Sequence, residues 1–457
     1  MINSKTKDII LKVRDIAEEK KIVATFSLHY ENSHLMRIGN NSVSLSTSEE
    51  LTRLDINVTI GLKQGSHTEM GEIRSIEQVE KCLNIAYEKA KVSKENDYTP
   101  IEDEVEETSE ENTQFDKNFE GLSPAFKADS YSKIFNEVGN DYNYSGSWSS
   151  GTTEQFIVTT KNNNSAYHIG TDQIFTIVLK HPKKSWEITV SQTGWKKDDF
   201  DLDSVIKELK MYVDYYEHLP SNKIEIKDYT VVLGPQALAE LIQMAMFTGL
   251  WGRRYEEKQA WTSENSIGDK ILGENITILD DPLNDNTFKI GFDMSGQKRI
   301  MRELVKNGNL SSLMYDSTTA AKFKKKKTGH DSRSYNFVLE TGTGVECPID
   351  AVKDYEEVLY IPALHYINLP NISKGIFTGS SRFNALLIRK GEVIGPIFSS
   401  RITDTFQNVF GNVEKISKLA VSVNISDTYA RRAPTAFSVP NYVVCKGVKI
   451  TDCAESF

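Results

Sequence analysis

The apolar residues of this chain follow a helical spacing in some stretches and a strand spacing in others. Apolar residues three and four apart predict amphipathic helices over residues 5–20, 76–93 and 203–217. Alternating or β-branched residues predict β-rich stretches over residues 21–65 and 141–194. The first half of the chain therefore mixes helices with antiparallel-type strands.

The second half opens with a strand and an unusually apolar helix. The strand YTVVLG, residues 229–234, leads into a predicted helix over residues 235–248. Pro235 stands in the first turn, where its missing N–H costs nothing, and Gly249 follows as a stop signal. Apolar residues occupy nearly every side of this helix, which is typical of a fully buried element. Short β-type runs fill the rest of the chain.

These patterns predict an α+β fold in two domains. A chain of 457 residues exceeds the roughly 250–300 residues at which a single core stops growing. We expect an N-terminal α+β domain over residues 1–220 and a β-rich C-terminal domain over residues 221–457. Each would hold a largely antiparallel or mixed sheet with a few helices, and the buried helix would be central in the second domain.

The distribution of charged residues argues against nucleic-acid binding and predicts two exposed segments. The net charge is −10, which disfavours a nucleic-acid-binding surface. Seven of the twelve residues from 100 to 111 are acidic, which predicts an exposed loop or linker. The basic run at residues 324–327 predicts a solvated loop or, as the alternative, an anionic docking point.

The same features predict a cytoplasmic protein. The four cysteines form no C-x-x-C pair, which favours reduced thiols. The first twenty residues do not have the pattern of a signal peptide, and no apolar run approaches the length of a membrane span.

Residues 229–282 and several later segments carry a family pattern. The later segments include GFDMSG, KKTGHDSR and IRKGEVIGPI. With them the chain resembles the TldD/TldE (PmbA) family of heterodimeric peptidases. The resemblance is strong over residues 229–415 and looser before them.

The resemblance implies a metal site whose ligands this chain lacks. In the TldD branch the central helix bears H-E-x-x-x-H, whose histidines hold zinc and whose Glu is the general base. The matching positions here are Gln243, Met244 and Thr248. A thioether cannot take up a proton, and neither an amide nor a hydroxyl replaces imidazole on zinc. The region that supplies a Cys ligand in TldD, SVNISDTYARRAPTAFSV, has no cysteine here.

The chain therefore resembles the TldE branch, which implies a noncatalytic subunit without a metal of its own. Zinc would belong to a TldD-like partner, and the pair would cut unfolded or leader peptides. The resemblance also marks four residues as candidates for substrate contact: Thr328, Gly329, His330 and Arg333. A basic surface turn is the alternative for that segment.

Other functions stay open at this point. The chain could be a regulatory or binding protein without a role in proteolysis, since members of the family carry the name modulator of DNA gyrase. It could also be a self-sufficient hydrolase, or a homodimer when its partner is absent. Asp280, Asp281, Asp285 and Asp293 could hold a hard cation or supply an acid and a base, although a turn is the simpler interpretation of Asp280 and Asp281.

Overall fold

The structure is a computed structural model that describes residues 1–119, 122–426 and 431–457, with the backbone alone at residues 109–113 and 333. Its strands form three sheets among the described residues, with helices packed on and between them. The predicted α+β class is confirmed. The strands of the first sheet all precede residue 195, and those of the other two sheets all follow residue 227.

The first sheet is long and mostly antiparallel. Its strand order is β3-β2-β1-β5-β6-β4, and β7 pairs with β6 beside β4. The strands are β1 (Val23–Gly39), β2 (Ser42–Ile60), β3 (Lys63–Met70), β4 (Thr108–Gln114), β5 (Asn143–Thr159), β6 (Ser165–Lys180) and β7 (Glu187–Gly194).

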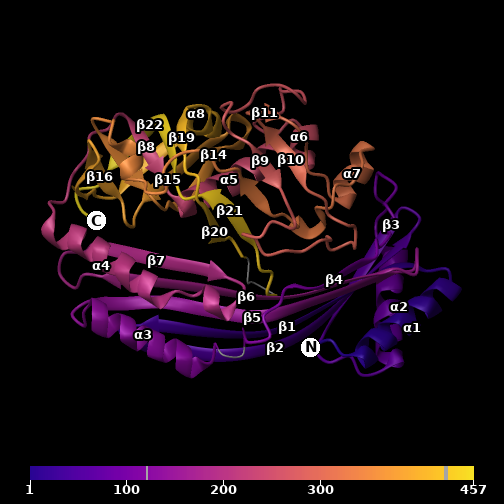
Figure 1. Cartoon of the computed structure of the whole chain (residues 1–457). Helices are drawn as coiled ribbons and strands as arrows, with labels where there is room; N and C mark the ends of the chain where they lie inside the picture. Colours follow the sequence, from indigo (N-terminus) through magenta and orange to yellow (C-terminus); the bar gives the residue numbers. More distant parts are fainter. Residues whose placement is uncertain (120–121, 427–430) are drawn as a thin grey trace.

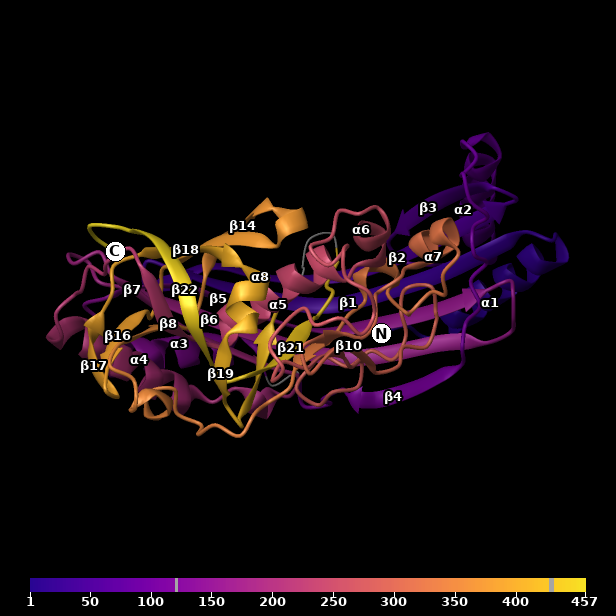
Figure 2. The same ribbon diagram turned by 90° about the horizontal axis from the view of Figure 1, so that it is seen from above.

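The two faces of this sheet have different neighbours. Directly paired residues point to the same face, and the pairs Phe26–Val158 and Met36–Trp148 are buried on the helix-covered face. Figure 1 shows α1 and α2 at one end of this sheet and α3 and α4 at the other, while the C-terminal half lies over the opposite face. Seen from above in Figure 2, the elements of the C-terminal half overlap the strands of the first sheet, and α1 and α2 lie at one end.

The helices begin where the sequence supplies a capping side chain. Asn3, Ser75 and Asp201 each accept a hydrogen bond from the backbone of the first turn that follows. The α-helices are α1 (Ser4–Glu19), α2 (Ile76–Val92), α3 (Pro124–Val138), α4 (Leu202–His218), α5 (Pro235–Gly249), α6 (Gly252–Glu256), α7 (Ser317–Phe323) and α8 (Phe406–Gly411). Short 3-10 helices are η2 (Lys197–Asp199), η3 (Asp331–Arg333), η4 (Asp350–Val352) and η5 (Ile372–Lys374).

The predicted helices are present within one or two residues of their expected bounds. The additions are the short helices α6, α7 and α8 and the longer helix α3. The signal for α3 was available, because Ser123 caps the helix and Pro124 occupies the first turn.

The C-terminal half holds the second and third sheets. The second sheet has the order β11-β10-β9-β12-β21-β20, and the third has the order β14-β15-β18-β22-β8-β13-β16-β17, with β19 paired to β22. The second comprises β9 (Ile278–Asp280), β10 (Arg302–Lys306), β11 (Asn309–Leu310), β12 (Phe337–Leu339), β20 (Ala420–Asn424) and β21 (Ala436–Pro440). The third comprises β8 (Asp228–Leu233), β13 (Val358–Ile361), β14 (His365–Asn371), β15 (Ile376–Ser381), β16 (Leu386–Arg389), β17 (Glu392–Pro396), β18 (Ser400–Thr405), β19 (Val413–Ile416) and β22 (Val443–Cys453).

Helix α5 is central to the core of this half. Leu238, Leu241, Ile242 and Met246 are fully buried in one cluster that includes residues of both C-terminal sheets. Burial of each such side chain contributes about 1.5–3 kcal/mol. The prediction of a central buried helix is therefore confirmed.

The two halves also share packing. Helix α4 contacts β7 of the first sheet and β17 of the third. The core cluster that contains Trp148 and Tyr212 continues into the C-terminal half through Val232 and Val444. A division near residue 220 follows the sheets, but the side chains on either side of it pack together.

The acidic segment differs from the exposed loop that its composition predicts. Residues 101–107 have no regular structure, whereas Thr108–Gln114 is β4, paired in parallel with β6. Val105 is fully buried in a cluster with Ile157 and Phe292. A free backbone edge on β6 and an apolar site for Val105 offset the cost of ordering charged residues, and composition reveals neither of them.

Two further predictions can be compared with the structure. All four cysteines are free thiols, as expected. Within the described ranges, no helix combines the length and apolar character that crossing a bilayer requires.

Candidate functional site

Helix α5 has one stripe that the core does not cover. Gln236, Glu240, Gln243, Met244 and Phe247 are only partly buried, whereas most of the helix is buried. Their spacing of three, four and seven residues places them on a single face. The stripe is the part of α5 from which side chains can meet a ligand.

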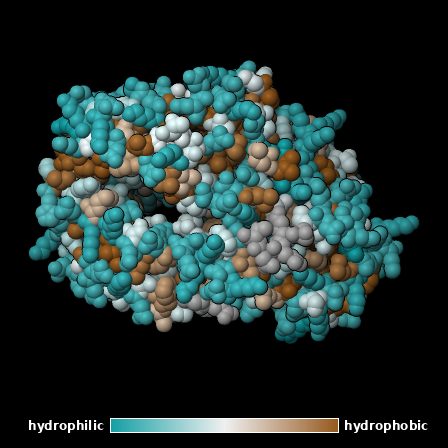
Figure 3. Space-filling view, viewed as in Figure 1, coloured by the Kyte–Doolittle hydropathy of each residue, from teal (hydrophilic) through white to brown (hydrophobic). Residues whose placement is uncertain are grey.

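This face opens onto a cavity between the first sheet and the C-terminal half. The cavity has a volume of about 440 Å³, and a second one of about 330 Å³ adjoins it, because Gln236, Glu240 and Asn424 line both. Figure 3 shows the surface hollowed between the two layers. Its floor is the C-terminal-facing side of β6 and β7, which contributes mainly threonine and serine, such as Thr176, Ser191 and Thr193.

Two carboxyl groups in the cavity are held in an environment that disfavours their charge. The Glu208 carboxyl of α4 faces the cavity, and the protein around the cavity separates it from bulk water. This desolvation raises the pKa of Glu208 to about 7. Burial also raises the pKa of Glu240, although the Gln236 amide, which donates to it at 2.8 Å, opposes the shift. The cavity therefore holds two carboxyls whose pKa values are raised, and that of Glu208 lies near neutrality. Neither carboxyl is predictable from the sequence, because a lone Glu on a helix carries no motif.

The three positions that the family resemblance singled out fall in two environments. Gln243 and Met244 line the smaller cavity. Thr248 is buried, and its hydroxyl donates to the Met244 carbonyl at 2.6 Å within the helix. The Gln243 amide donates to the Tyr335 hydroxyl at 3.1 Å.

This donor set does not fit a zinc ion. Zinc prefers thiolate, imidazole and carboxylate ligands, and α5 presents an amide, a thioether and a hydroxyl at these positions. The amide is engaged with Tyr335, and the hydroxyl satisfies a helix carbonyl. No step of metal-assisted hydrolysis can be assigned to these three side chains.

The segment that carries the predicted substrate contacts is packed inside the protein. His330 is fully buried, with Nδ1 2.8 Å from the Thr328 hydroxyl and Nε2 3.2 Å from Asp280. Gly329 is buried with φ +82°, and a side chain there would meet Arg299. Thr328, Gly329 and His330 do not line the cavities beside α5. Arg333 lies in η3, and its side chain is outside the described residues.

Asp280 joins this segment to the second sheet. Arg299 Nη2 lies 2.8 and 3.1 Å from its two carboxylate oxygens, and the Asn336 N–H donates at 2.6 Å. Burial raises the pKa of Asp280, but the Arg299 charge and the bonds from His330 and Asn336 outweigh this and lower it to about 2. This Asp is therefore part of a structural ion pair and not the cation site considered from sequence. The expected turn is present: β9 ends at Asp280, and Asp281 Oδ1 accepts from the Leu283 N–H at 3.1 Å in the turn that follows.

The other aspartates of that group are also accounted for. Asp293 accepts from the backbone and hydroxyl of Ser295 and from the Asp331 N–H, which shapes a tight loop. Asp285 pairs with Lys289 at the surface at 2.6 Å. Lys324 to Lys326 are exposed, as a solvated loop requires, while Lys327 lies 3.7 Å from Asp103.

Comparison with known families identifies the C-terminal half. The family model described as PmbA/TldA metallopeptidase C-terminal domain matches residues 226–452. The chain belongs to the TldD/PmbA family. The family match covers α5 and the sheets around it, so the cavity lies against the part of the chain that defines the family.

Two curated proteins are similar to this chain over part of their length. The chain is 28% identical over 199 residues to an uncharacterized protein of Methanocaldococcus jannaschii, which is 41% of this chain and 47% of that protein. It is 28% identical over 165 residues to a metalloprotease of Methanothermobacter thermautotrophicus, which is 32% of this chain and 35% of that protein. The chain thus spans less than half the length of these curated relatives.

Solved structures share the fold over the whole chain. TldE from Thermococcus kodakarensis superposes with a TM-score of 0.82 at 16% identity, covering 97% of this chain and all of that one. A proposed modulator of DNA gyrase from Bacteroides thetaiotaomicron gives 0.82 at 15% identity, covering 99% of this chain and all of that one. At such identities the likeness concerns the fold alone.

Proposed function

We propose that this chain is the noncatalytic, TldE-like subunit of a heterodimeric zinc metallopeptidase. The observation that supports the proposal is the pair Gln243 and Met244, which face a cavity from the helix where the family resemblance expects a zinc ligand and a general base. Neither side chain binds zinc well or takes up a proton. In this proposal the metal and the general base come from a TldD-like partner.

The cavity suggests how such a subunit would contribute. Strand β20 is the last strand of its sheet among the described residues, and Val421 to Asn424 line the cavity along it. Strand β7 lines the same cavity from the first sheet. An extended, unfolded peptide can add to a free strand edge by main-chain hydrogen bonds, independently of its sequence. The subunit would thus hold a substrate chain and exclude bulk water while its partner cuts.

The proposal includes a cytoplasmic location. Four free thiols, one of them on the exposed Cys347, are suited to a reducing compartment.

The test is a reconstitution with a protein that carries H-E-x-x-x-H. A fluorescein-labelled unstructured peptide is incubated with this chain, with the partner, and with both. We expect cleavage by the mixture that exceeds the partner alone at least tenfold and stops on addition of a chelator. Chelator-sensitive cleavage by this chain alone would falsify the proposal, as would a mixture no more active than the partner.

A second candidate function is hydrolysis by this chain itself. The observation that favours it is the pKa of Glu208, raised to about 7, in the cavity that Glu240 also lines. A protonated and an ionised carboxyl can act as general acid and base. Cleavage by the isolated chain that resists a chelator and is lost in Glu208→Gln or Glu240→Gln would select this candidate.

A role as a modulator of DNA gyrase has weaker support. It rests on the name of the Bacteroides structure, with which this chain shares its fold. The net charge of −10 disfavours direct contact with duplex DNA. Salt-sensitive duplex binding in a gel shift would bring this candidate forward.

A further inference from the structure

The edge of the first sheet, far along the chain from α5, has an unusual polar arrangement where it meets α2. Strand β3 is the edge strand and pairs with β2, so that Gly65, His67 and Glu69 stand opposite Val58, Ile56 and Leu54. The three β2 residues are buried under the N-terminal helices. Paired residues share a face, so the β3 residues point toward α2 as well. Packing alone would favour apolar side chains at these positions, yet two of the three residues are His67 and Glu69.

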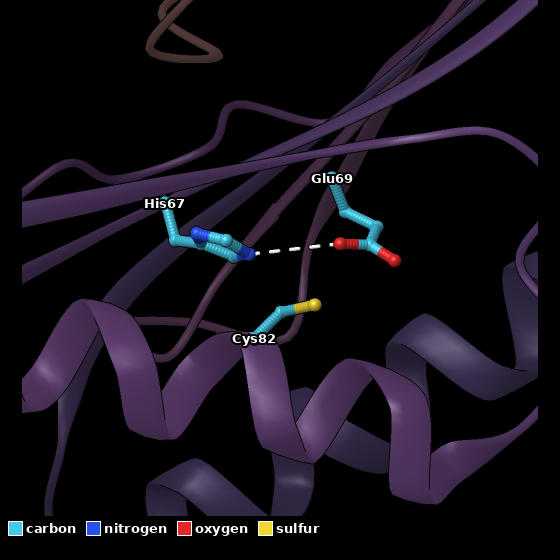
Figure 4. Close-up of side chains that lie close together, drawn as sticks. All are labelled: His67, Glu69 and Cys82. Atoms are coloured by element: carbon cyan, nitrogen blue, oxygen red, sulfur yellow. Dashed lines mark ion pairs between the residues drawn. The ribbon is translucent and has the colours of Figure 1, made fainter.

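Helix α2 completes this arrangement with a thiol. Cys82 is buried on the face of α2 that packs against β3, and His67, Glu69 and Cys82 each bring a ligand-type atom within 4.8 Å of the others. Figure 4 shows the three side chains converging from the strand and the helix. Two residues before His67 on β3, only a glycine fits at position 65, because a side chain there would collide with the backbone of Ala90 in α2. The close approach of α2 fixes the distance between the thiol and the strand.

We propose that His67, Glu69 and Cys82 form a binding site for Zn²⁺. Imidazole, carboxylate and thiolate are the three protein ligands that zinc prefers. Two ligands on a tetrahedral ion lie about 3.5 Å apart, from bond lengths of about 2.0–2.3 Å. His67 Nε2 and Glu69 Oε2 are separated by 3.6 Å. The carboxylate and the thiolate together neutralise the two charges of the ion.

The surroundings of the cluster suit a bound ion in two further respects. The Gln78 amide donates to Glu69 Oε1 at 3.1 Å, which orients the carboxylate and leaves Oε2 toward His67. The side chains of His67 and Glu69 are 20% and 33% exposed, so water can supply a fourth ligand and the ion can enter. Gln78 and Cys82 are four residues apart on α2 and therefore share its inward face.

The site would fasten an edge strand to the helix that covers it. Burial, together with the Glu69 charge, raises the pKa of the Cys82 thiol to about 11 in the metal-free protein. Binding must release that proton, so the affinity for zinc rises with pH. The site is independent of the proposed peptidase role, because it uses no residue of α5 or of the cavity.

Cobalt titration of the metal-free, full-length chain tests the proposal. We expect one equivalent of Co²⁺ to give a thiolate-to-cobalt charge-transfer absorption and the strong visible bands of a tetrahedral ion, both removed by Zn²⁺. Cys82→Ser should abolish the charge-transfer absorption and weaken Zn²⁺ binding at least tenfold. The control Cys347→Ser removes the exposed thiol and should change neither.

Two outcomes would overturn the proposal. One is the absence of a thiolate band in the unmodified chain, and the other is a band that persists in Cys82→Ser. If Cys82→Ser does not fold, a His67→Gln variant serves instead, since that side chain is only partly buried, and a Zn²⁺ affinity equal to that of the unmodified chain would then overturn the proposal. Failure of the peptidase reconstitution would leave these results unchanged, so the two proposals fail separately.

Discussion

Arg432 Nε donates to Asp172 Oδ1 at 2.7 Å across the interface between the C-terminal half and the first sheet. The same guanidinium donates to the Ser149 hydroxyl at 2.8 Å, and the Arg432 N–H donates to Glu31 at 2.5 Å. Arg432 and Asp172 are both buried. Through its side chain and its backbone N–H, this one residue joins a C-terminal segment to three strands of the sheet.

Replacing Arg432 with Ala should destabilise the protein strongly. Asp172 would be left buried without its charge partner, a change that typically costs about 3–5 kcal/mol. Urea unfolding followed by fluorescence measures the loss. Arg389→Ala is the matched control, because Arg389 pairs with Glu357 at the surface and such pairs contribute about 0–1 kcal/mol. Equal effects of the two substitutions would contradict the buried ion pair.

Glu208→Gln and Glu240→Gln should separate the two peptidase functions. If the partner supplies the catalytic groups, each variant keeps kcat of the reconstituted pair within about threefold, since neither carboxyl enters the reaction. General acid or base catalysis by either one would instead contribute about 10²–10⁴-fold. Peptide cleavage at saturating substrate measures kcat. Asp203→Asn, on the exposed face of α4, controls for changes to the helix.

Glu208 should also make stability depend on pH. Its folded pKa of about 7 lies above the value of about 4.3 for an unfolded Glu, so the folded state holds the proton more tightly. This contribution is fully present below about pH 4 and is lost as pH rises toward 7. Glu208→Gln should therefore gain stability relative to the unmodified chain between pH 5 and pH 8 in urea unfolding, and a constant difference would contradict the shift.

Lys127 should make stability depend on pH with the opposite sign, so that the protein becomes more stable as pH rises. It is fully buried, with Nζ 2.7 Å from the Ser150 hydroxyl and 3.0 Å from His34. Burial, and then the Arg432 charge, lower its pKa to about 7, against the pull of Asp172. An unfolded Lys titrates near 10.4, so folding is disfavoured below pH 7 and becomes more favourable as pH rises from 7 to 10.

Comparison of urea unfolding at pH 6.5 and pH 9 measures the effect of Lys127. The unmodified chain should gain stability at the higher pH relative to Lys127→Met. The exposed Lys133→Met on the same helix should behave like the unmodified chain. A gain that persists in Lys127→Met would assign it to another group.

Gly65→Ala should disturb the contact between α2 and β3. The added Cβ would lie 2.3 Å from the Ala90 nitrogen and 2.4 Å from the Ala86 carbonyl oxygen, which are rigid helix backbone. Overpacking of this kind costs about 1–3 kcal/mol. Gly411→Ala is the control, since its Cβ would meet nothing within 4 Å and should change stability by less than about 0.5 kcal/mol. Thermal unfolding measures both.

Local sequence patterns were sufficient to predict structure where the neighbours of a residue along the chain determine its environment. Apolar spacing located α1, α2, α4 and α5, and the all-round apolar character of α5 predicted its burial. The family pattern picked out Gln243 and Met244, which do line a cavity. The prediction that Thr328, Gly329 and His330 contact a substrate stays a prediction. The Thr328 and His330 side chains bond to each other, and the backbone of Gly329 packs close to Arg299.

The tertiary structure decided what depends on residues far apart in sequence. The strand at Thr108–Gln114 forms because β6 offers an edge, and Glu208 acquires a raised pKa because the C-terminal half encloses it. His67 and Cys82 meet across a strand and a helix, a spacing that no ligand motif describes. The sequence by itself determined α1, α2, α4 and α5, the α+β class and the amide and thioether on α5. The sequence did not reveal which strands pair or which cavities form. Both depend on desolvation and hydrogen bonding between segments that are distant along the chain and approach one another only in the folded protein.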